Sequence, residues 1–287
     1  MRILSAHGTR AALPMEDAID ALKGAFGSDT DAPQRQLVGN SFIMPGRVRQ
    51  HVAVKVVSTV PGNPVGIVAV FDGEGTPLGL VDGPTLTAIR TGAAAGLATD
   101  MLARKRSTVL AMIGAGAMAR DQIAAIREVR DVERIVVWSR DLAKAMALAR
   151  DVGAHCAESP DEAVDGADIV TTATPSTTPL FCADVLQAHV HINAIGAFTP
   201  EMVEIPPAFV RDAFVVVEDR AAAAQEAGDL IQAGKEPDAT LAQLLTDPFA
   251  RQHERTLFKS VGIATMDVAA AVRALENAER MGLGIVV

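Results

Sequence analysis

The chain has 287 residues, of which 49% are hydrophobic and 21% are charged, and its mean hydropathy is +0.24. This composition excludes an intrinsically disordered chain, and the length leaves room for about two folded domains. The 35 acidic and 26 basic residues give a formal net charge of −9, which excludes a generally basic surface for nucleic acid. Any anionic ligand must therefore be met by a few placed cations.

The start of the chain shows no targeting signal. The sequence MRILSAHGTR lacks the apolar stretch and cleavage site of a secretory leader, and no apolar run approaches the ~20 residues of a membrane span. The two cysteines, Cys156 and Cys182, have neither disulfide-framework nor metal-ligand spacing. The sequence predicts a cytoplasmic protein without a bound metal, and with neither nucleic acid nor a membrane as partner.

Three short apolar segments in the first third of the chain have the composition of strands. They are HVAVKVVST, GIVAVFD and TPLGLVDG, and the connecting sequences PGNP and DGEG are strong turn signals. Consecutive strands joined by short turns run antiparallel. We therefore expect an antiparallel or mixed sheet here.

An alanine-rich helix over 86–102 leads into a block in which short apolar runs alternate with helical stretches. This alternation is typical of βαβ units around a parallel sheet, and it extends from about residue 104 to about residue 262. A closing amphipathic helix over 267–280 is expected to pack back onto the first domain. Within the block, we expect strands at 108–113, 134–138, 168–172, 191–195 and 214–217, and helices at 118–129, 142–151 and 161–164.

The predicted fold class is therefore α/β, with a doubly wound Rossmann-type sheet and a second domain that is discontinuous in sequence. We place the α+β domain at 1–103 with 263–287, and the Rossmann-type domain at 104–262. No internal repeat and no low-complexity segment interrupts this pattern.

A glycine motif, IGAGAMA, directly follows the first strand of the Rossmann-type block and begins a helix. It fits G-x-G-x-x-A: the first glycine permits a tight turn, the second lets backbone N–H groups approach a pyrophosphate, and Ala119 allows close packing of helix on strand. The helix N-terminus adds the positive end of its dipole. The motif predicts dinucleotide binding, with contacts from Gly114, Gly116, Ala117 and Met118.

The type of dinucleotide depends on the end of the next strand, where the sequence is Trp138-Ser139-Arg140-Asp141. Ser139 and Arg140 suit a ribose 2′-phosphate, while Asp141 is well placed to cap the following helix. This interpretation favours NADPH. In the alternative, Arg140 is a solvated loop residue and Asp141 binds the ribose 2′-hydroxyl, which would favour NADH.

Three cations in the first domain have unusual surroundings. Lys55 lies in the apolar strand HVAVKVV, where an ammonium either reaches solvent at a sheet edge or meets an anion. Arg90 lies in a helix of small and apolar residues, where an unpaired guanidinium would be costly. Arg35 is either a surface arginine or the third member of a cluster. Together the three predict a site for a small carboxylate.

Read with these sites, the chain resembles the ornithine cyclodeaminase/μ-crystallin family. The resemblance extends from about Arg35 to Gly284, in the order of the family's motifs. The matching segments are KVVSTVPGN, LVDGPTLTAIRTGAAAG, IGAGAMA, GADIVTTATPSTTP, HINAIGAFTPEMVE, QEAGD and FKSVGIATMD.

This resemblance implies a homodimer. The discontinuous first domain would form the subunit contact and the floor of the substrate site, facing the Rossmann domain across a cleft. It also implies roles for single residues. Arg35, Lys55 and Arg90 would hold the substrate carboxylate, and Glu226 would face the substrate.

The resemblance also assigns cofactor contacts outside the glycine motif. For Ser260 an alternative stays open, namely a strand-end hydroxyl that satisfies a turn. The contacts implied are Arg90, Thr91, Thr174, Ala194, Ile195, Gly196 and Ser260.

One departure from the family pattern bears on the reaction. Ornithine cyclodeaminases carry an aspartate that engages the substrate amine, and GAFTP places Phe198 at that position. A phenyl ring cannot accept a proton or pair with an amine. If Phe198 instead packs in a core, the position still lacks the carboxylate. The GAFTPEMVE form resembles family members that reduce cyclic ketimines.

We therefore expect NAD(P)H-dependent reduction of a small cyclic imino acid, as in proline metabolism. The substrate would be Δ1-pyrroline-2-carboxylate, giving L-proline, and Δ1-piperideine-2-carboxylate, giving L-pipecolate, is a second candidate. Lys55 would be the catalytic residue, as a proton donor near the imine nitrogen, although water could also supply that proton. The alternatives are an alanine-type dehydrogenase, an ornithine cyclodeaminase and a non-catalytic, NADPH-dependent binding protein.

Overall fold

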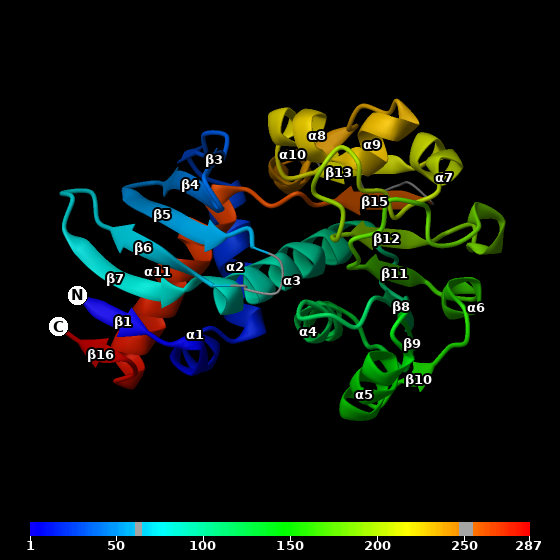
Figure 1. Ribbon diagram of the computed structural model, residues 1–287, viewed down its shortest axis with the longest axis horizontal. Coiled ribbons are helices and arrows are strands. Elements are labelled where there is room, and N and C mark those ends of the chain that lie inside the picture. Colours follow the sequence, from blue (N-terminus) through cyan, green and yellow to red (C-terminus); the bar gives the residue numbers. More distant parts are fainter. Residues whose placement is uncertain (61–64, 247–254) are drawn as a thin grey trace. The chain divides into compact units, whose positions relative to one another are not determined.

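The computed structural model describes residues 1–60, 65–246 and 255–287 (Figure 1). The chain divides into two compact units, Met1–Ala94 with Ile263–Val287, and Ala95–Gly262. The division falls within helix α3, Gly83–Leu102, whereas the sequence predicted a boundary after this helix, at 103/104. An alanine-rich helix without a break gives no sequence signal for a boundary inside it.

The first unit is built on a mixed sheet. Strands β4 to β7 pair antiparallel in sequence order, and β1 lies parallel to β7, as the sequence predicted for this sheet. The predicted turn DGEG is present, since Asp72 N–H donates to Thr76 O and Gly75 N–H to Asp72 O. The predicted turn PGNP lies outside the described residues. The strands are β1 Arg2–Leu4, β2 Thr30–Asp31, β3 Gln36–Val38, β4 Ser41–Val48, β5 His51–Ser58, β6 Gly66–Phe71, β7 Pro77–Asp82 and β16 Ile285–Val286.

The two faces of this sheet differ. The closing helix α11, Ala264–Met281, packs on strands β4 and β5 and on helix α2, Met15–Phe26. Ala53 and Lys55 point to this covered face and are buried, whereas Val56 of the same strand and its register partner Ile67 are exposed. The unit also contains the short helix α1, Ala6–Ala12.

The second unit is a doubly wound parallel sheet, as the sequence predicted. Its strand order is β10-β9-β8-β11-β12-β15-β13-β14, and every adjacent pair is parallel. The order reverses between β8 and β11, which is where ligands bind in such sheets. The strands are β8 Val109–Ile113, β9 Arg134–Trp138, β10 His155–Cys156, β11 Ile169–Thr172, β12 His191–Ala194, β13 Phe214–Val217, β14 Ala239–Thr240 and β15 Thr256–Lys259.

Helices on both faces of the parallel sheet bury continuous apolar clusters, for example Ile123 and Ile126 against Leu110 and Met112. Among the described residues, no helix is both long and apolar enough to cross a membrane. The helical segments are α4 Ala119–Val129, α5 Leu142–Val152, α6 Pro160–Val164, the 3₁₀ turn η1 Ala183–Val185, α7 Pro207–Asp212, α8 Arg220–Glu226, α9 Gly228–Ala233 and α10 Leu241–Thr246.

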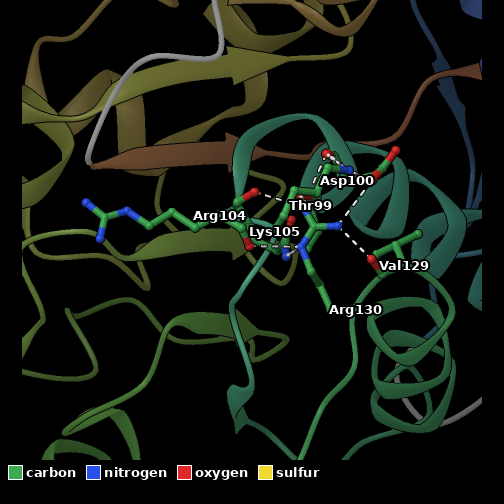
Figure 2. A network of polar contacts seen from close by, with 8 residues as sticks. Thr99, Asp100, Arg104, Lys105, Val129 and Arg130 are labelled. Carbon is green, nitrogen blue, oxygen red and sulfur yellow. Dashed lines mark hydrogen bonds and ion pairs between the residues drawn. The ribbon is translucent and has the colours of Figure 1, made fainter.

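A buried arginine closes the C-terminal end of α3 inside the second unit (Figure 2). The Arg130 guanidinium donates to the carbonyl oxygens of Thr99 at 2.7 Å, Ala103 at 2.8 Å and Arg104 at 3.1 Å. It also pairs with the Asp100 carboxylate at 3.1 Å. One side chain thereby adds hydrogen-bond donors at the end of a helix, where intrahelical donors run out.

Candidate functional site

A cavity of about 510 Å³ opens at the carboxyl edge of the parallel sheet. The loops after β8, β9 and β11 line it, so it lies at the point where the strand order reverses. This position is the usual dinucleotide site of a doubly wound sheet. The lining residues are Gly114, Ala115, Gly116, Trp138, Ser139, Arg140, Asp141, Lys144, Ala173, Thr174, Pro175, Ser176, Thr178, Pro179 and Leu180.

The glycine motif has the geometry that a pyrophosphate requires. Gly114 has φ +109°, and a Cβ there would lie 2.6 Å from the carbonyl oxygen of Ala173. A Cβ on Gly116 would meet nothing within 4 Å, so the backbone is open to an approaching group. Ala119 is fully buried at the start of α4, and Met118 is the N-cap of that helix. These features fit a dinucleotide phosphate at a helix N-terminus.

The end of β9 presents cations to the cavity. Arg140 is exposed and Lys144 follows it one helical turn later, and both line the cavity together with Ser139. The Asp141 carboxylate accepts the Lys144 backbone N–H at 3.1 Å as the N-cap of α5, the capping position favoured by the sequence. The pKa of Asp141 is lowered because its carboxylate accepts this N–H and lies near the Lys144 ammonium.

Six predicted cofactor contacts of the second unit do not line this cavity, as far as the described residues show. The Ser260 hydroxyl donates to the buried Glu218 carboxylate, so it has a partner within the protein. The Ile195 N–H donates to Thr172 O, and the Gly196 N–H donates to the Glu204 carboxylate. The residues concerned are Ala117, Met118, Ala194, Ile195, Gly196 and Ser260, and their cofactor contacts stay predictions.

A second cluster lies in the first unit, where Lys55 and Arg90 meet one carboxylate. Lys55 Nζ and Arg90 Nε each donate to Oδ1 of Asp267, both at 3.1 Å. All three side chains are buried, with residue exposures of 3%, 5% and 1%. No hydrogen bond from the described residues reaches Asp267 Oδ2. Lys55 therefore does not reach solvent at a sheet edge, which was the alternative for this residue.

The electrostatics of this cluster leave an excess of positive charge. Burial lowers the pKa of Lys55 to about 8, and the neighbouring charges of Arg90 and Arg35 act in the same direction, whereas Asp267 opposes them. Arg35 is half-buried, and its guanidinium lies 4.8 Å from the centre of the Phe42 ring. Two buried cations share one carboxylate here, and the charge of a third cation, Arg35, also acts on the pKa of Lys55. Such a site is stabilised when it binds an anion.

Asp267 is the member of this cluster that the sequence analysis did not assign. It stands in the first turn of α11 in the segment ATMDVAAAV, a charged residue among small and apolar ones. The same signal singled out Lys55 and Arg90. What the sequence did not show is that the three meet, because Lys55 and Asp267 are separated by 212 positions.

Three further residues that the sequence singled out, Thr91, Glu226 and Phe198, lie in or beside helices and loops of the two units. Thr91 is buried beside Arg90 in α3, and Glu226 is the half-buried last residue of α8. Phe198, which stands where cyclodeaminases carry an aspartate, is 38% exposed and so is not a core residue. Within the described residues, no group of His, Cys, Asp and Glu side chains has the arrangement of a metal site.

Comparison with known proteins decides the family. The model of the ornithine cyclodeaminase/mu-crystallin family matches residues 24–282. The chain belongs to this family. A relative that spans 99% of the chain and 98% of its own length is the Delta(1)-pyrroline-2-carboxylate reductase of Bacillus cereus, which is 36% identical.

Two solved structures of similar proteins show the family fold with ligands. The Delta(1)-pyrroline-2-carboxylate reductase of Thermococcus litoralis, in complex with NADH and L-proline, is 31% identical and superposes with a TM-score of 0.92 over the whole of both chains. An archaeal alanine dehydrogenase, a dimer with bound NAD, is 26% identical with a TM-score of 0.90 and covers all of this chain and 98% of its own. Family members of this fold therefore bind nicotinamide dinucleotides, in agreement with the cavity and glycine motif of this chain.

Proposed function

We propose that the protein is an NAD(P)H-dependent oxidoreductase that reduces the C=N bond of cyclic ketimines. Its substrate is Δ1-pyrroline-2-carboxylate, which is reduced to L-proline. Δ1-Piperideine-2-carboxylate, which gives L-pipecolate, is a second substrate with the same carboxylate and the same bond. The Bacillus and Thermococcus relatives carry the name of the first activity and support it for this chain.

The observation that carries this proposal is the buried cluster of Lys55, Arg90 and Asp267. Burying two cations against one carboxylate leaves a net positive charge away from water, which is costly unless an anion binds there. A small acid supplies that anion through its carboxylate. The fork of Arg90 and the nearby Arg35 suit such a carboxylate because guanidinium groups bind it through paired N–H donors.

Besides holding the carboxylate, the protein must orient the imine and supply a proton. When bound, the reduced nicotinamide supplies the hydrogen and the electron pair that the imine carbon gains, and the imine nitrogen gains a proton. Arg35 and Arg90 hold the carboxylate so that the imine stays in a fixed orientation. Lys55, whose pKa is lowered to about 8, can give its proton near neutral pH more readily than an ordinary lysine, and so is the proposed proton donor.

Asp267 then serves as the counter-ion of the cluster. Its carboxylate opposes the effect of burial on the pKa of Lys55 and so keeps the ammonium charged in the free protein. Because Oδ1 meets both Lys55 and Arg90, it also fixes these two side chains relative to each other before a ligand binds.

A second candidate is reductive amination of a 2-oxo acid. It is favoured by the likeness to the archaeal alanine dehydrogenase, and the same cations could hold the carboxylate of pyruvate. Cyclodeamination of a diamino acid is disfavoured because Phe198 offers no carboxylate for a second amine. A protein that only binds its ligand would oxidise no cofactor in the experiment that follows.

The deciding experiment measures cofactor oxidation with one substrate at a time. The five-membered and the six-membered cyclic imino acids, and pyruvate with ammonium, are each tested with NADPH and with NADH. Ornithine with a catalytic amount of NAD is tested for release of ammonia. We expect turnover with the cyclic imino acids at a kcat/KM at least tenfold above that with pyruvate. Turnover only with pyruvate, ammonia release from ornithine, or no turnover would each contradict the proposal.

NADPH is the proposed preferred cofactor. Ser139, Arg140 and Lys144 line the cavity at the end of β9, while the carboxylate of Asp141 is engaged in capping α5. The Arg140→Ala substitution should raise the KM for NADPH about tenfold and change that for NADH little, since only NADPH carries the 2′-phosphate. An equal effect on the two cofactors would contradict this preference.

We also propose that the protein forms a homodimer and works in the cytoplasm, where reduced nicotinamide nucleotides are available to it. The homodimer is supported by the dimeric archaeal alanine dehydrogenase and by the exposed apolar face of the first unit's sheet. Large apolar patches on a protein surface mark interaction sites.

A further inference from the structure

The wall of the dinucleotide cavity is held by a buried carboxylate that no predicted role includes. Glu204 is fully buried and accepts four hydrogen bonds. Its Oε1 accepts from the backbone N–H of Thr174 at 2.7 Å and from the Thr174 hydroxyl at 2.9 Å. Its Oε2 accepts from the N–H of Gly196 at 2.7 Å and of Ala197 at 3.1 Å. One side chain thus joins the loops that follow the neighbouring strands β11 and β12.

Two further buried charges hold Glu204 itself. Asp229 Oδ1 accepts from the backbone N–H of Glu204 at 2.7 Å and of Ile205 at 2.9 Å. The other oxygen of Asp229 pairs with Lys259 Nζ at 2.9 Å, and the same ammonium lies 3.4 Å from the Ala194 carbonyl oxygen at the end of β12. Asp229 and Lys259 are as deeply buried as Glu204. Lys259 of β15, Asp229 and Glu204 therefore form a connected series of buried charged groups that ends at the loops of the cavity.

The backbone around Glu204 supports the same wall. Val203 N–H donates to Ser176 O at 2.9 Å, and Leu180 N–H donates to Glu204 O at 2.9 Å. Ser176 and Leu180 both line the dinucleotide cavity, as does Thr174. Val203 and Glu204 therefore form hydrogen bonds with the loop on one side of the cavity at Thr174, Ser176 and Leu180.

The two loops approach each other too closely to tolerate a side chain between them. A Cβ on Gly196 would lie 2.2 Å from the Thr174 nitrogen and 2.7 Å from Glu204 Oε1. A side chain at position 196 would therefore displace the Thr174 backbone or the Glu204 carboxylate. The donors that surround it satisfy a charge that burial alone would make costly.

We propose that Glu204, supported by Asp229 and Lys259, is a positioning residue for the nicotinamide dinucleotide. It holds the 173–180 loop and the Gly196 turn in their binding geometry before the cofactor arrives. Glu204 is buried behind Thr174 and does not line the cavity, so its effect is transmitted through the loops it holds. Preorganisation of this kind improves affinity because the loops are not ordered at the moment of binding.

The test compares two carboxylates that both accept hydrogen bonds from backbone N–H groups of the parallel sheet. Asp168 differs in that its other oxygen also contacts the His189 ring at 3.3 Å. The variant is Glu204→Gln, which keeps the size of the side chain but turns an amide group toward backbone donors. The matched control is Asp168→Asn, because Asp168 Oδ2 accepts from the N–H groups of Thr108 at 2.9 Å and Val109 at 3.0 Å at the opposite, amino edge of the same sheet. Trp138 is the single tryptophan of the chain and lines the cavity, so its quenching by NADPH or NADH reports the Kd directly.

In Glu204→Gln we expect the Kd for the reduced cofactor to rise about tenfold or more at a temperature where the variant is folded. In Asp168→Asn we expect a lower Tm and a Kd within twofold of the parent. The proposal is overturned if Glu204→Gln lowers the Tm but binds the cofactor like the parent, or if both variants weaken binding equally.

A second measurement on the parent protein keeps the proposal testable if the variant does not fold. Hydrogen exchange of the Thr174, Gly196 and Ala197 amides is followed without and with cofactor. Because Glu204 already holds these amides, we expect strong protection in the cofactor-free protein and little further change on binding. Rapid exchange that slows only when cofactor is added would overturn the proposal.

Discussion

Lys55 is a buried ammonium that holds its proton less tightly than an exposed lysine. It lies on the covered face of a sheet, with Asp267 as its counter-ion and Arg90 on the same carboxylate oxygen. Burial and the neighbouring cations lower its pKa to about 8. The positive charge of Lys55 is therefore present below this pH and is lost as the pH rises through about 8.

The first prediction concerns this titration. Binding of pyrrole-2-carboxylate, a ring acid of the substrate's size, should weaken as the pH rises through about 8 and Lys55 loses its charge. Titration calorimetry at a series of pH values measures the Kd. In Lys55→Arg this weakening should vanish, because a guanidinium stays charged at these pH values. An unchanged pH profile in Lys55→Arg would assign the titration to another group.

The second prediction concerns catalysis by the same residue. Lys55→Met removes both a carboxylate ligand and the proposed proton donor, so kcat/KM for Δ1-pyrroline-2-carboxylate should fall by about 10²-fold or more. Steady-state assays with saturating NADPH measure it. Lys23→Met, which changes an exposed lysine of helix α2, is the matched control and should leave kcat/KM unchanged. Parental turnover in Lys55→Met would exclude the proposed role.

At the scale of elements, helix α3 is fastened at its C-terminal end by polar contacts from β12 and from Arg130. Arg130 follows α4 and donates to carbonyls in the last turn of α3 (Figure 2). The Asn193 amide of β12 donates to the Thr99 hydroxyl at 2.9 Å, and its oxygen pairs with His191 Nε2 at 3.1 Å. Burial lowers the pKa of His191 to about 3, so this imidazole stays neutral and serves as a structural hydrogen-bonding group.

The third prediction tests this fastening. Arg130→Met should lower the free energy of unfolding by about 3 kcal/mol, because several buried carbonyls lose a charged donor together. Urea unfolding followed by circular dichroism measures the change. Arg127→Met is the control, since Arg127 is exposed and donates only to Val152 O among the described contacts. It should cost about 1 kcal/mol or less. Equal losses in the two variants would show that burial of Arg130 adds nothing.

At the scale of the whole molecule, one sheet face of the first unit carries several exposed apolar residues. The uncovered face of the first unit's sheet carries Val52, Val56 and Ile67, which occupy matching positions of β5 and β6. Val38 of β3, the strand that pairs with β4, is also exposed. Two copies that bury Val56 and Ile67 against each other would remove apolar area from water.

The fourth prediction follows for the oligomeric state. The parent protein should have the mass of a dimer in light scattering after size-exclusion chromatography, and Ile67→Glu should shift it toward the monomer because a buried carboxylate would lack a partner. Ile231→Glu in α9 is the control, since Ile231 is 42% exposed and Ile67 is 49% exposed. It should leave the mass unchanged. A monomeric parent protein, or an equal effect of both substitutions, would contradict the proposed dimer surface.

Local patterns in the sequence were sufficient for much of this molecule. The strands β9 and β13 match their predicted ranges to the residue, and α4 and α5 agree to within one residue at each end. Periodicity predicts such elements because the parallel sheet is buried on both faces and its helices on one. The strand β15, Thr256–Lys259, was not predicted because its apolar run, Leu257 and Phe258, is too short to show a period.

By itself, the sequence determined the order of most elements, the glycine turn at Gly114 and the presence of cations among apolar neighbours, because each depends on neighbours in the chain. Only the tertiary structure decided which carboxylate those cations meet, since Lys55 and Arg90 reach Asp267 from the far end of the chain. The tertiary structure also decided the partners of Glu204, Asp229 and Lys259. Glu204 and Asp229 accept backbone N–H groups of distant segments, and Asp229 pairs with Lys259. A buried charge is recognisable from its apolar surroundings, but its partner is fixed by the packing of distant segments.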